Sequence, residues 1–200
     1  MWRRTLTIGM TLVAAATFAG AQGTTRPASP AGSSETQLGK NGKWIEITYS
    51  RPIKRGRDVW GSGASYGKEV LLQDNAVVWR AGANMSTRLK TEAALQIGGK
   101  TVPAGEYSLF IDAKSPTDWT LIVSAWAAQP KYDPDNKAAL WGSIGYTPDK
   151  DVVRVAMTIG KLPVSIDELT WNFADVTPAG GKLVLMWDTV VASAPFTVAP

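Results

Sequence analysis

Hydrophobic and polar side chains alternate along most of the chain with a period of two residues. Ile45, Ile47 and Tyr49 fall on one side of an extended segment, while Glu46 and Thr48 fall on the other. Such alternation predicts a β-strand with one buried face. The pattern recurs at residues 107–111, 119–123, 153–159, 169–173 and 183–187, and more weakly at 77–80, 93–97 and 195–198. Strands therefore dominate the predicted structure.

Turn-forming residues separate the predicted strands. Gly98 and Gly99 permit the positive φ angles of a two-residue hairpin, and residues 103–105 and 178–181 each combine a proline with a glycine. No segment has the pattern of a long capped helix, and residues 135–141 are the best candidate for one or two helical turns. We therefore predict an all-β fold: a single antiparallel β-sandwich, jelly-roll-like, with at most one short helix.

The amino terminus has the pattern of an export signal. Arg3 and Arg4 precede an uncharged apolar run at residues 6–18, and small residues suited to a signal peptidase end at Ala21. The run is shorter than the roughly 20 residues that a membrane-spanning helix needs. We predict that residues 1–21 are a cleaved signal peptide, which places the mature protein in the periplasm or outside the cell. The adjacent arginines also resemble a twin-arginine signal, so two export routes stay open.

The remainder of the chain divides into a leader and one domain. Residues 22–39 contain mostly Gly, Ser, Thr, Pro, Ala and Gln, a composition that predicts a flexible leader. Residues 40–200 suit a single domain that is long enough to bury a substantial core. No later apolar run approaches membrane-spanning length. Because the chain has no cysteine, the exported domain must be stable without disulfides.

The sequence contains neither histidine nor cysteine. This removes the usual general base near neutral pH, the thiolate nucleophile and the common ligands of zinc, copper and haem. Residues 63–67 match the G-x-S-x-G pattern of a nucleophile elbow, but that site also needs a histidine, so we interpret them as a surface loop. Residues 133–136 begin like a calcium loop but lack its later ligands, which favours a turn. We predict no catalytic residues, no cofactor and no metal site.

Two segments, residues 49–61 and 79–87, carry the side chains best suited to ligand binding. Guanidinium groups bind anions and hydroxyl groups through several N–H donors, and tryptophan rings stack on ligands. The same arginines can instead tie loops together by donating to backbone carbonyls. The candidate ligand-binding residues are Tyr49, Arg57, Trp79, Arg80, Asn84 and Thr87.

Short motifs in and around these segments resemble one family. They include Tyr49-Ser50-Arg51-Pro52, Trp79-Arg80-Ala81-Gly82-Ala83-Asn84, Gly105-Glu106-Tyr107-Ser108-Leu109-Phe110 and Leu183-Val184-Leu185-Met186-Trp187. On these motifs, residues 40–198 resemble the DUF2911 family of exported bacterial proteins, a domain family of unknown function. The resemblance implies a single exported β domain and brings no established reaction. Met85 stands where the family usually has an acidic residue, which weakens any role for a carboxylate there.

These features favour a binding domain over an enzyme. We expect a non-enzymatic domain of the cell envelope that binds a small molecule, a glycan or a protein partner. The alternative is a carbohydrate-active hydrolase that uses paired carboxylates across a cleft. The net charge of +4 is not concentrated in a basic run with interleaved aromatics, which excludes a typical nucleic-acid-binding face.

Overall fold

The computed structural model describes residues 27–71 and 76–200. The predicted signal peptide at 1–21 lies outside the described residues, and so do the first residues of the predicted leader. Within the described part of the chain, no helix has the length and apolar character needed to cross a membrane.

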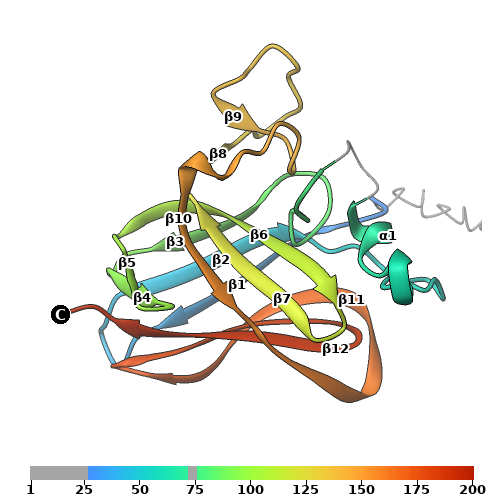
Figure 1. Ribbon diagram of the computed structural model, residues 1–200. Coiled ribbons are helices and arrows are strands. Elements are labelled where there is room, and N and C mark those ends of the chain that lie inside the picture. The colour runs from blue at the N-terminus through green and yellow to red at the C-terminus, as the bar shows by residue number, and fades with distance from the viewer. Residues whose placement is uncertain (1–26, 72–75) are drawn as a thin grey trace, which may run out of the picture.

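The larger of two facing sheets has six antiparallel strands in the order β1-β2-β3-β6-β7-β10. Two of its five pairings, β1–β2 and β6–β7, are hairpins between consecutive strands, and the other three join segments farther apart in the chain. Figure 1 labels each of these six strands. Their bounds are β1 (Ala31–Gln37), β2 (Trp44–Ser50), β3 (Thr87–Thr91), β6 (Gly105–Ser115), β7 (Asp118–Ser124) and β10 (Asp151–Ala156).

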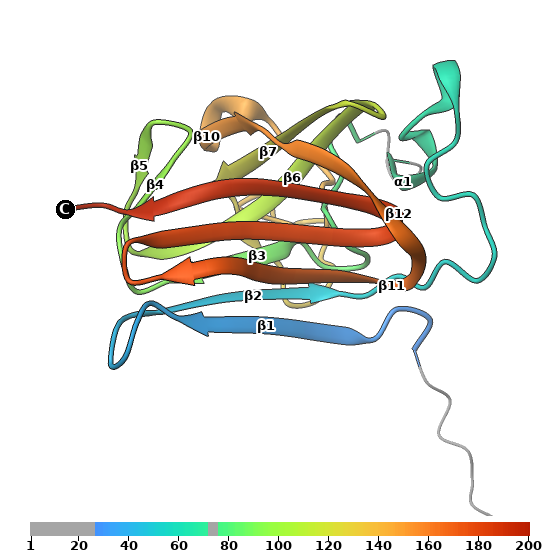
Figure 2. The same cartoon turned by 90° about the horizontal axis from the view of Figure 1, so that it is seen from below.

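The second sheet has four antiparallel strands in the order β11-β12-β4-β5. Two of them, β11 and β12, are long and form one hairpin whose register shifts twice between Lys161 and Thr170. In Figure 2 this hairpin lies in front of the six-stranded sheet. The two facing sheets confirm the predicted antiparallel β-sandwich. The bounds are β4 (Leu95–Ile97), β5 (Lys100–Val102), β11 (Thr158–Thr177) and β12 (Gly180–Val198).

The main core fills the space between the sheets with the apolar side chains of the alternating strands. Trp60, Trp79, Trp119 and Trp187 form one cluster in which ring centroids lie 4.8 to 6.5 Å apart. Trp171 is fully buried beside them in the same core. These five tryptophans are thus part of the hydrophobic core, where large aromatic rings contribute most to burial.

A smaller core lies on the opposite, outer face of the six-stranded sheet. There, residues 126–146 form a lobe that contains a short parallel pair, β8 (Ala127–Ala128) and β9 (Ala139–Leu140). Figure 1 shows the lobe projecting beyond the sheet. It covers the apolar side chains that this face presents. The buried residues are Val78, Phe110, Ile122, Trp126, Leu140 and Tyr146.

Three predicted elements need correction. Residues 31–37 of the predicted leader form β1, because an edge strand of small and polar residues needs only backbone hydrogen bonds to β2. Residues 135–141 form a turn and β9 instead of a helix, and the short helix is α1 (Lys68–Leu71). The predicted strand at 153–159 is interrupted at Met157, where the chain passes from one sheet to the other. Two 3₁₀ turns complete the elements, η1 (Gly63–Ser65) and η2 (Pro148–Lys150).

Candidate functional site

Three of the six predicted ligand-binding residues, Arg57, Trp79 and Arg80, line one cavity of about 280 Å³, which we call the arginine pocket. The pocket lies where the loop after β2, helix α1 and the segment before β3 meet. Two tryptophans are among its lining residues, Trp79 and Trp187, and their rings stack with centroids 6.1 Å apart. The two segments singled out in the sequence therefore do meet in space.

The guanidinium of Arg57 is already engaged within its own loop. Its Nε donates to the carbonyl oxygen of Lys54 at 3.0 Å, and Nη2 donates to that of Ile53 at 2.9 Å. Nη1 lies 3.9 Å from the carboxylate of Glu69 on α1. These contacts show that Arg57 ties its loop together by donating to backbone carbonyls. Glu69 also offsets the positive charge of Arg57, which an anionic ligand would need.

The other three predicted residues lie outside the arginine pocket. Thr87 is fully buried and donates its hydroxyl to the carbonyl of Ala81 at 3.0 Å. Asn84 is exposed and has a left-handed backbone with φ of 57°, a conformation that asparagine tolerates better than most residues. Tyr49 packs its ring in the core, where burial raises the pKa of its hydroxyl and the hydroxyl donates to the carbonyl of Trp171.

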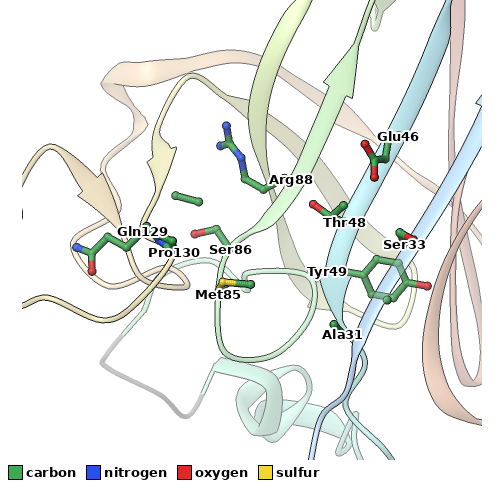
Figure 3. A pocket seen from close by; sticks show the side chains of 12 residues that line it. Ala31, Ser33, Glu46, Thr48, Tyr49, Met85, Ser86, Arg88, Gln129 and Pro130 are labelled. Atoms are coloured by element: carbon green, nitrogen blue, oxygen red, sulfur yellow. The ribbon is translucent and has the colours of Figure 1, made fainter.

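A larger hollow of about 530 Å³ lies on the outer face of strands β1, β2 and β3, and we call it the sheet groove. The lobe overhangs one side of it. Figure 3 shows Glu46, Thr48 and Arg88 on the groove side of the sheet, with the ring of Tyr49 turned to the other side. The groove is lined by Ala31, Gly32, Ser33, Glu46, Thr48, Tyr49, Met85, Ser86, Arg88, Ala128, Gln129 and Pro130.

Arg88 is the fixed cation of the sheet groove. Its Nη1 donates to the Ser108 hydroxyl at 2.9 Å and to the Trp126 carbonyl at 3.0 Å. Its Nη2 lies 3.6 Å from the carboxylate of Glu106. Burial lowers the pKa of Arg88, and Glu106 opposes that shift, so the side chain stays charged near neutral pH. These contacts hold one guanidinium in one orientation at the wall of the groove.

The strand register places complementary polar groups next to Arg88. Thr48 is paired with Arg88, and Ser33 is paired with Thr48, so the side chains cross three strands in one row. Glu46 lies two residues along β2 on the same face. Among the described residues, no hydrogen bond engages the side chains of Ser33, Glu46 or Thr48. These side chains are therefore free to donate to or accept from a ligand. The neighbouring lining residues Ala31 and Gly32 are small, so they leave the groove open.

Paired carboxylates suited to hydrolysis do not line the sheet groove, where Glu46 is the one acidic residue. Elsewhere, Glu35, Glu46 and Glu92 line a small cavity of about 90 Å³ together with Lys90 and Trp44. Another carboxylate pair is bridged by Arg154, which lies 3.5 Å from Asp112 and 2.9 Å from Asp151. Tyr146 donates to the same Asp151 at 2.6 Å, and burial raises the pKa of its hydroxyl. The guanidinium of Arg154 lies between these two carboxylates, so they do not form the open pair across a cleft that a glycoside hydrolase uses.

Sequence reasoning missed most of the sheet groove. The alternation in β2 placed Glu46 and Thr48 on the solvent face, but it gave no partner for them. Residues 87–91 also alternate, and this pattern was the available signal for Arg88. The residues of the groove come together only through the pairing of β1, β2 and β3 and through the position of the lobe. These are contacts between distant parts of the chain, which local patterns do not reveal.

Comparison with known proteins adds a family assignment. No curated protein and no solved structure matches the chain. The model of one family, described as a protein of unknown function, matches residues 29–196 and so includes β1, both sheets, the arginine pocket and the sheet groove. The chain belongs to the DUF2911 family.

Proposed function

We propose that this protein is an exported, non-enzymatic binding domain whose sheet groove holds a neutral, hydroxyl-rich ligand such as a short glycan. The observation that carries the proposal is the row of Ser33, Thr48 and Arg88 across three strands of the sheet groove. A volume of about 530 Å³ falls in the usual range of small-molecule sites, about 300 to 1,000 Å³.

Hydroxylated ligands fit the chemistry of this row better than anions do. Each sugar hydroxyl donates one hydrogen bond and accepts others, so it can donate to Glu46 and accept from Arg88 at once. An anion would gain from Arg88 but would face Glu46 in the groove and Glu106 on the far side of the guanidinium. Within the lining, Glu46 offsets the charge of Arg88, so the groove carries no net positive charge to favour an anion.

A thermal-shift screen with a blocked groove tests the proposal. The protein is screened against cello-, xylo-, malto- and chito-oligosaccharides, and against phosphate, sulfate and citrate. A ligand present at 100 times its Kd stabilises the folded state by about 2.7 kcal/mol, which raises the melting temperature by several degrees. Ser33→Trp fills the groove from β1 and abolishes the shift. Thr197→Trp, at an exposed position of β12 in the other sheet, keeps it.

Other results of the screen would contradict the proposal. A shift with anions alone, or a glycan shift that survives Ser33→Trp, would place binding elsewhere. Release of new reducing ends from a bound oligosaccharide would favour the hydrolase alternative. Export is tested separately by mass spectrometry of the protein recovered from the cell envelope or the medium, for which we expect an amino terminus at Gln22.

A further inference from the structure

The lobe contains a second cavity of about 240 Å³, which we call the lobe pocket. It is smaller than most sites for drug-sized molecules, so it suits one ring of a ligand better than a chain. Its walls combine three aromatic side chains with several polar groups. The lining residues are Trp126, Gln129, Tyr132, Asp133, Pro134, Asn136, Lys137, Ala139, Leu140, Trp141, Ile144 and Gly145.

Two of the aromatic rings are presented at an angle to each other. The ring centroids of Tyr132 and Trp141 lie 6.3 Å apart, and the ring planes are inclined by 57°. Tyr132 is 52% exposed, although an aromatic ring in a loop gains more from burial. Two inclined rings that remain partly open to solvent offer a ligand an apolar face to stack on.

Gln129 holds the irregular loop of the lobe in one shape. Its buried amide nitrogen lies 2.9 to 3.1 Å from the carbonyl oxygens of Asp133, Asn136 and Ala139, which share its two N–H donors. Its own carbonyl accepts from the backbone N–H of Asp133 at 2.8 Å. A loop fixed by four bonds to one side chain is preorganised, which lowers the entropic cost of binding a ligand.

The polar groups of the pocket still have capacity for a ligand. Asp133 uses Oδ1 to accept from the backbone of Asp135, and Asn136 uses Oδ1 to accept from Ala138. In the part of the chain that the structure describes, no hydrogen bond engages Asp133 Oδ2, Asn136 Nδ2 or the Tyr132 hydroxyl. One carboxylate acceptor, one amide donor and one phenol therefore lie beside the two rings.

The charge around the pocket disfavours a cationic ligand. An aromatic pocket of this kind can bind an alkylammonium ion through cation–π contacts. Here Lys150 already lies over the Trp126 ring, with Nζ 3.6 Å from the centroid, and Lys137 lines the pocket. Within the lining, Lys137 offsets the one carboxylate of Asp133, so the pocket carries no net negative charge to attract a cation.

We propose that the lobe pocket is a binding site for one neutral sugar ring, which stacks on Tyr132 and Trp141 and bonds to Asp133 and Asn136. This site does not depend on the sheet groove, since the two hollows share only Gln129 among their lining residues. A sugar ring has an apolar face for the aromatic rings and hydroxyls that both donate and accept.

Titration of the tryptophan fluorescence with methyl glycosides of glucose, galactose, mannose, xylose and N-acetylglucosamine tests this proposal. We expect saturable binding of at least one glycoside by the full domain. Tyr132→Ala weakens it about tenfold or more through loss of stacking, whereas Tyr132→Phe, which keeps the ring, stays within about threefold. Because Tyr132 is half exposed, its substitution leaves the unfolding midpoint nearly unchanged.

Two controls separate this site from others. Trp44→Ala removes a different exposed aromatic residue, 43% exposed on β2, and leaves glycoside binding unchanged. Ser33→Trp blocks the sheet groove and also leaves it unchanged, so each proposal can fail without the other. Absence of saturable binding by all five glycosides, equal binding by Tyr132→Ala, or binding of tetramethylammonium in their place would overturn the proposal.

Discussion

Ala81 has a left-handed backbone, with φ of 55°, in the segment that carries Trp79 and Arg80. An alanine in this conformation costs about 1 kcal/mol or more. Its carbonyl accepts two buried hydrogen bonds, from Trp171 Nε1 at 2.9 Å and from the Thr87 hydroxyl at 3.0 Å. The unusual turn is thus held by one side chain from each sheet.

Thr87→Val tests this arrangement, because valine keeps the shape of threonine and removes the donor. We expect a loss of about 1 to 2 kcal/mol in the free energy of unfolding, measured by denaturant titration. Thr48→Val makes the same exchange at an exposed position of β2 and should change stability by less than about 0.5 kcal/mol. Equal effects of the two substitutions would show that the buried bond contributes nothing.

Gly142 approaches the Arg80 segment so closely that a side chain does not fit. A Cβ atom there would lie 2.6 Å from Arg80 Nη1 and 3.1 Å from the carbonyl oxygen of Asn84. Gly142 and Gly99 both have positive φ angles, of 62° and 77°, but a Cβ at Gly99 would meet nothing within 4 Å.

Gly142→Ala should therefore destabilise the protein more than Gly99→Ala. We expect about 1 kcal/mol for Gly99→Ala from backbone strain alone, and about 1 to 3 kcal/mol more for Gly142→Ala from crowding. Thermal or denaturant unfolding of the two variants measures the difference. A smaller loss for Gly142→Ala than for Gly99→Ala would contradict the close packing of the lobe on Arg80.

At the scale of elements, the long β11–β12 hairpin bends where its register shifts around Ile166. Asp188 stands opposite Ile166 with a left-handed backbone, at φ of 53°. Its carboxylate accepts from Lys54 Nζ and from the Ser165 hydroxyl, the latter at 2.7 Å. Burial acts to raise the pKa of Asp188, but these bonds outweigh it, and the net pKa is lowered.

The lowered pKa of Asp188 predicts a pH dependence of stability. A carboxyl whose folded pKa lies below its unfolded value, about 3.9, stabilises the fold above that pH and loses the effect as pH falls through the folded pKa. Asp188→Asn should cost about 1 to 3 kcal/mol at pH 7. The difference from the unaltered protein should shrink as pH falls from about 5 to 2, whereas a constant difference would contradict the assignment. Asp118→Asn, exposed at a turn, serves as the control.

Strand β1 is an edge strand that the pattern of hydrophobic and polar residues did not predict. Its residues, Ala-Gly-Ser-Ser-Glu-Thr-Gln, contain no large apolar side chain, so composition resembles a linker. Pairing with β2 depends on backbone groups that every residue carries. The small side chains also keep the sheet groove open, so the misassigned segment is part of the candidate site.

Hydrogen exchange distinguishes a paired β1 from a flexible leader. We expect alternate backbone amides within residues 31–37 to exchange at least about tenfold more slowly than an unstructured chain, because alternate N–H groups donate to β2. The described residues 27–30, which precede the strand, should exchange faster. Uniformly fast exchange across 31–37 would restore the leader interpretation.

At the scale of the whole molecule, the sequence predicted most strands and turns, because alternation and turn-forming residues are local signals. Five of the six clear alternating segments lie within strands, and 153–159 is divided between β10 and β11 at Met157. Gly98-Gly99 forms the β4–β5 hairpin with φ of 56° and 77°. Short strands such as β5 and β8 carry too few residues for a pattern. The sheet groove and the lobe pocket were not predicted, because each joins segments far apart in the chain and no local signal marks such a meeting.

The central claim is that the sheet groove is the ligand site, and an NMR titration of the ¹⁵N-labelled domain tests it most directly. The titrant is the oligosaccharide that gives the largest thermal shift in the screen. We predict saturable shifts of the backbone amides at residues 31–33, 46–48 and 86–88, which lie together only in the folded sheet. Shifts confined to residues 57 and 79–82 around the arginine pocket, or no saturable shifts at all, would contradict the claim.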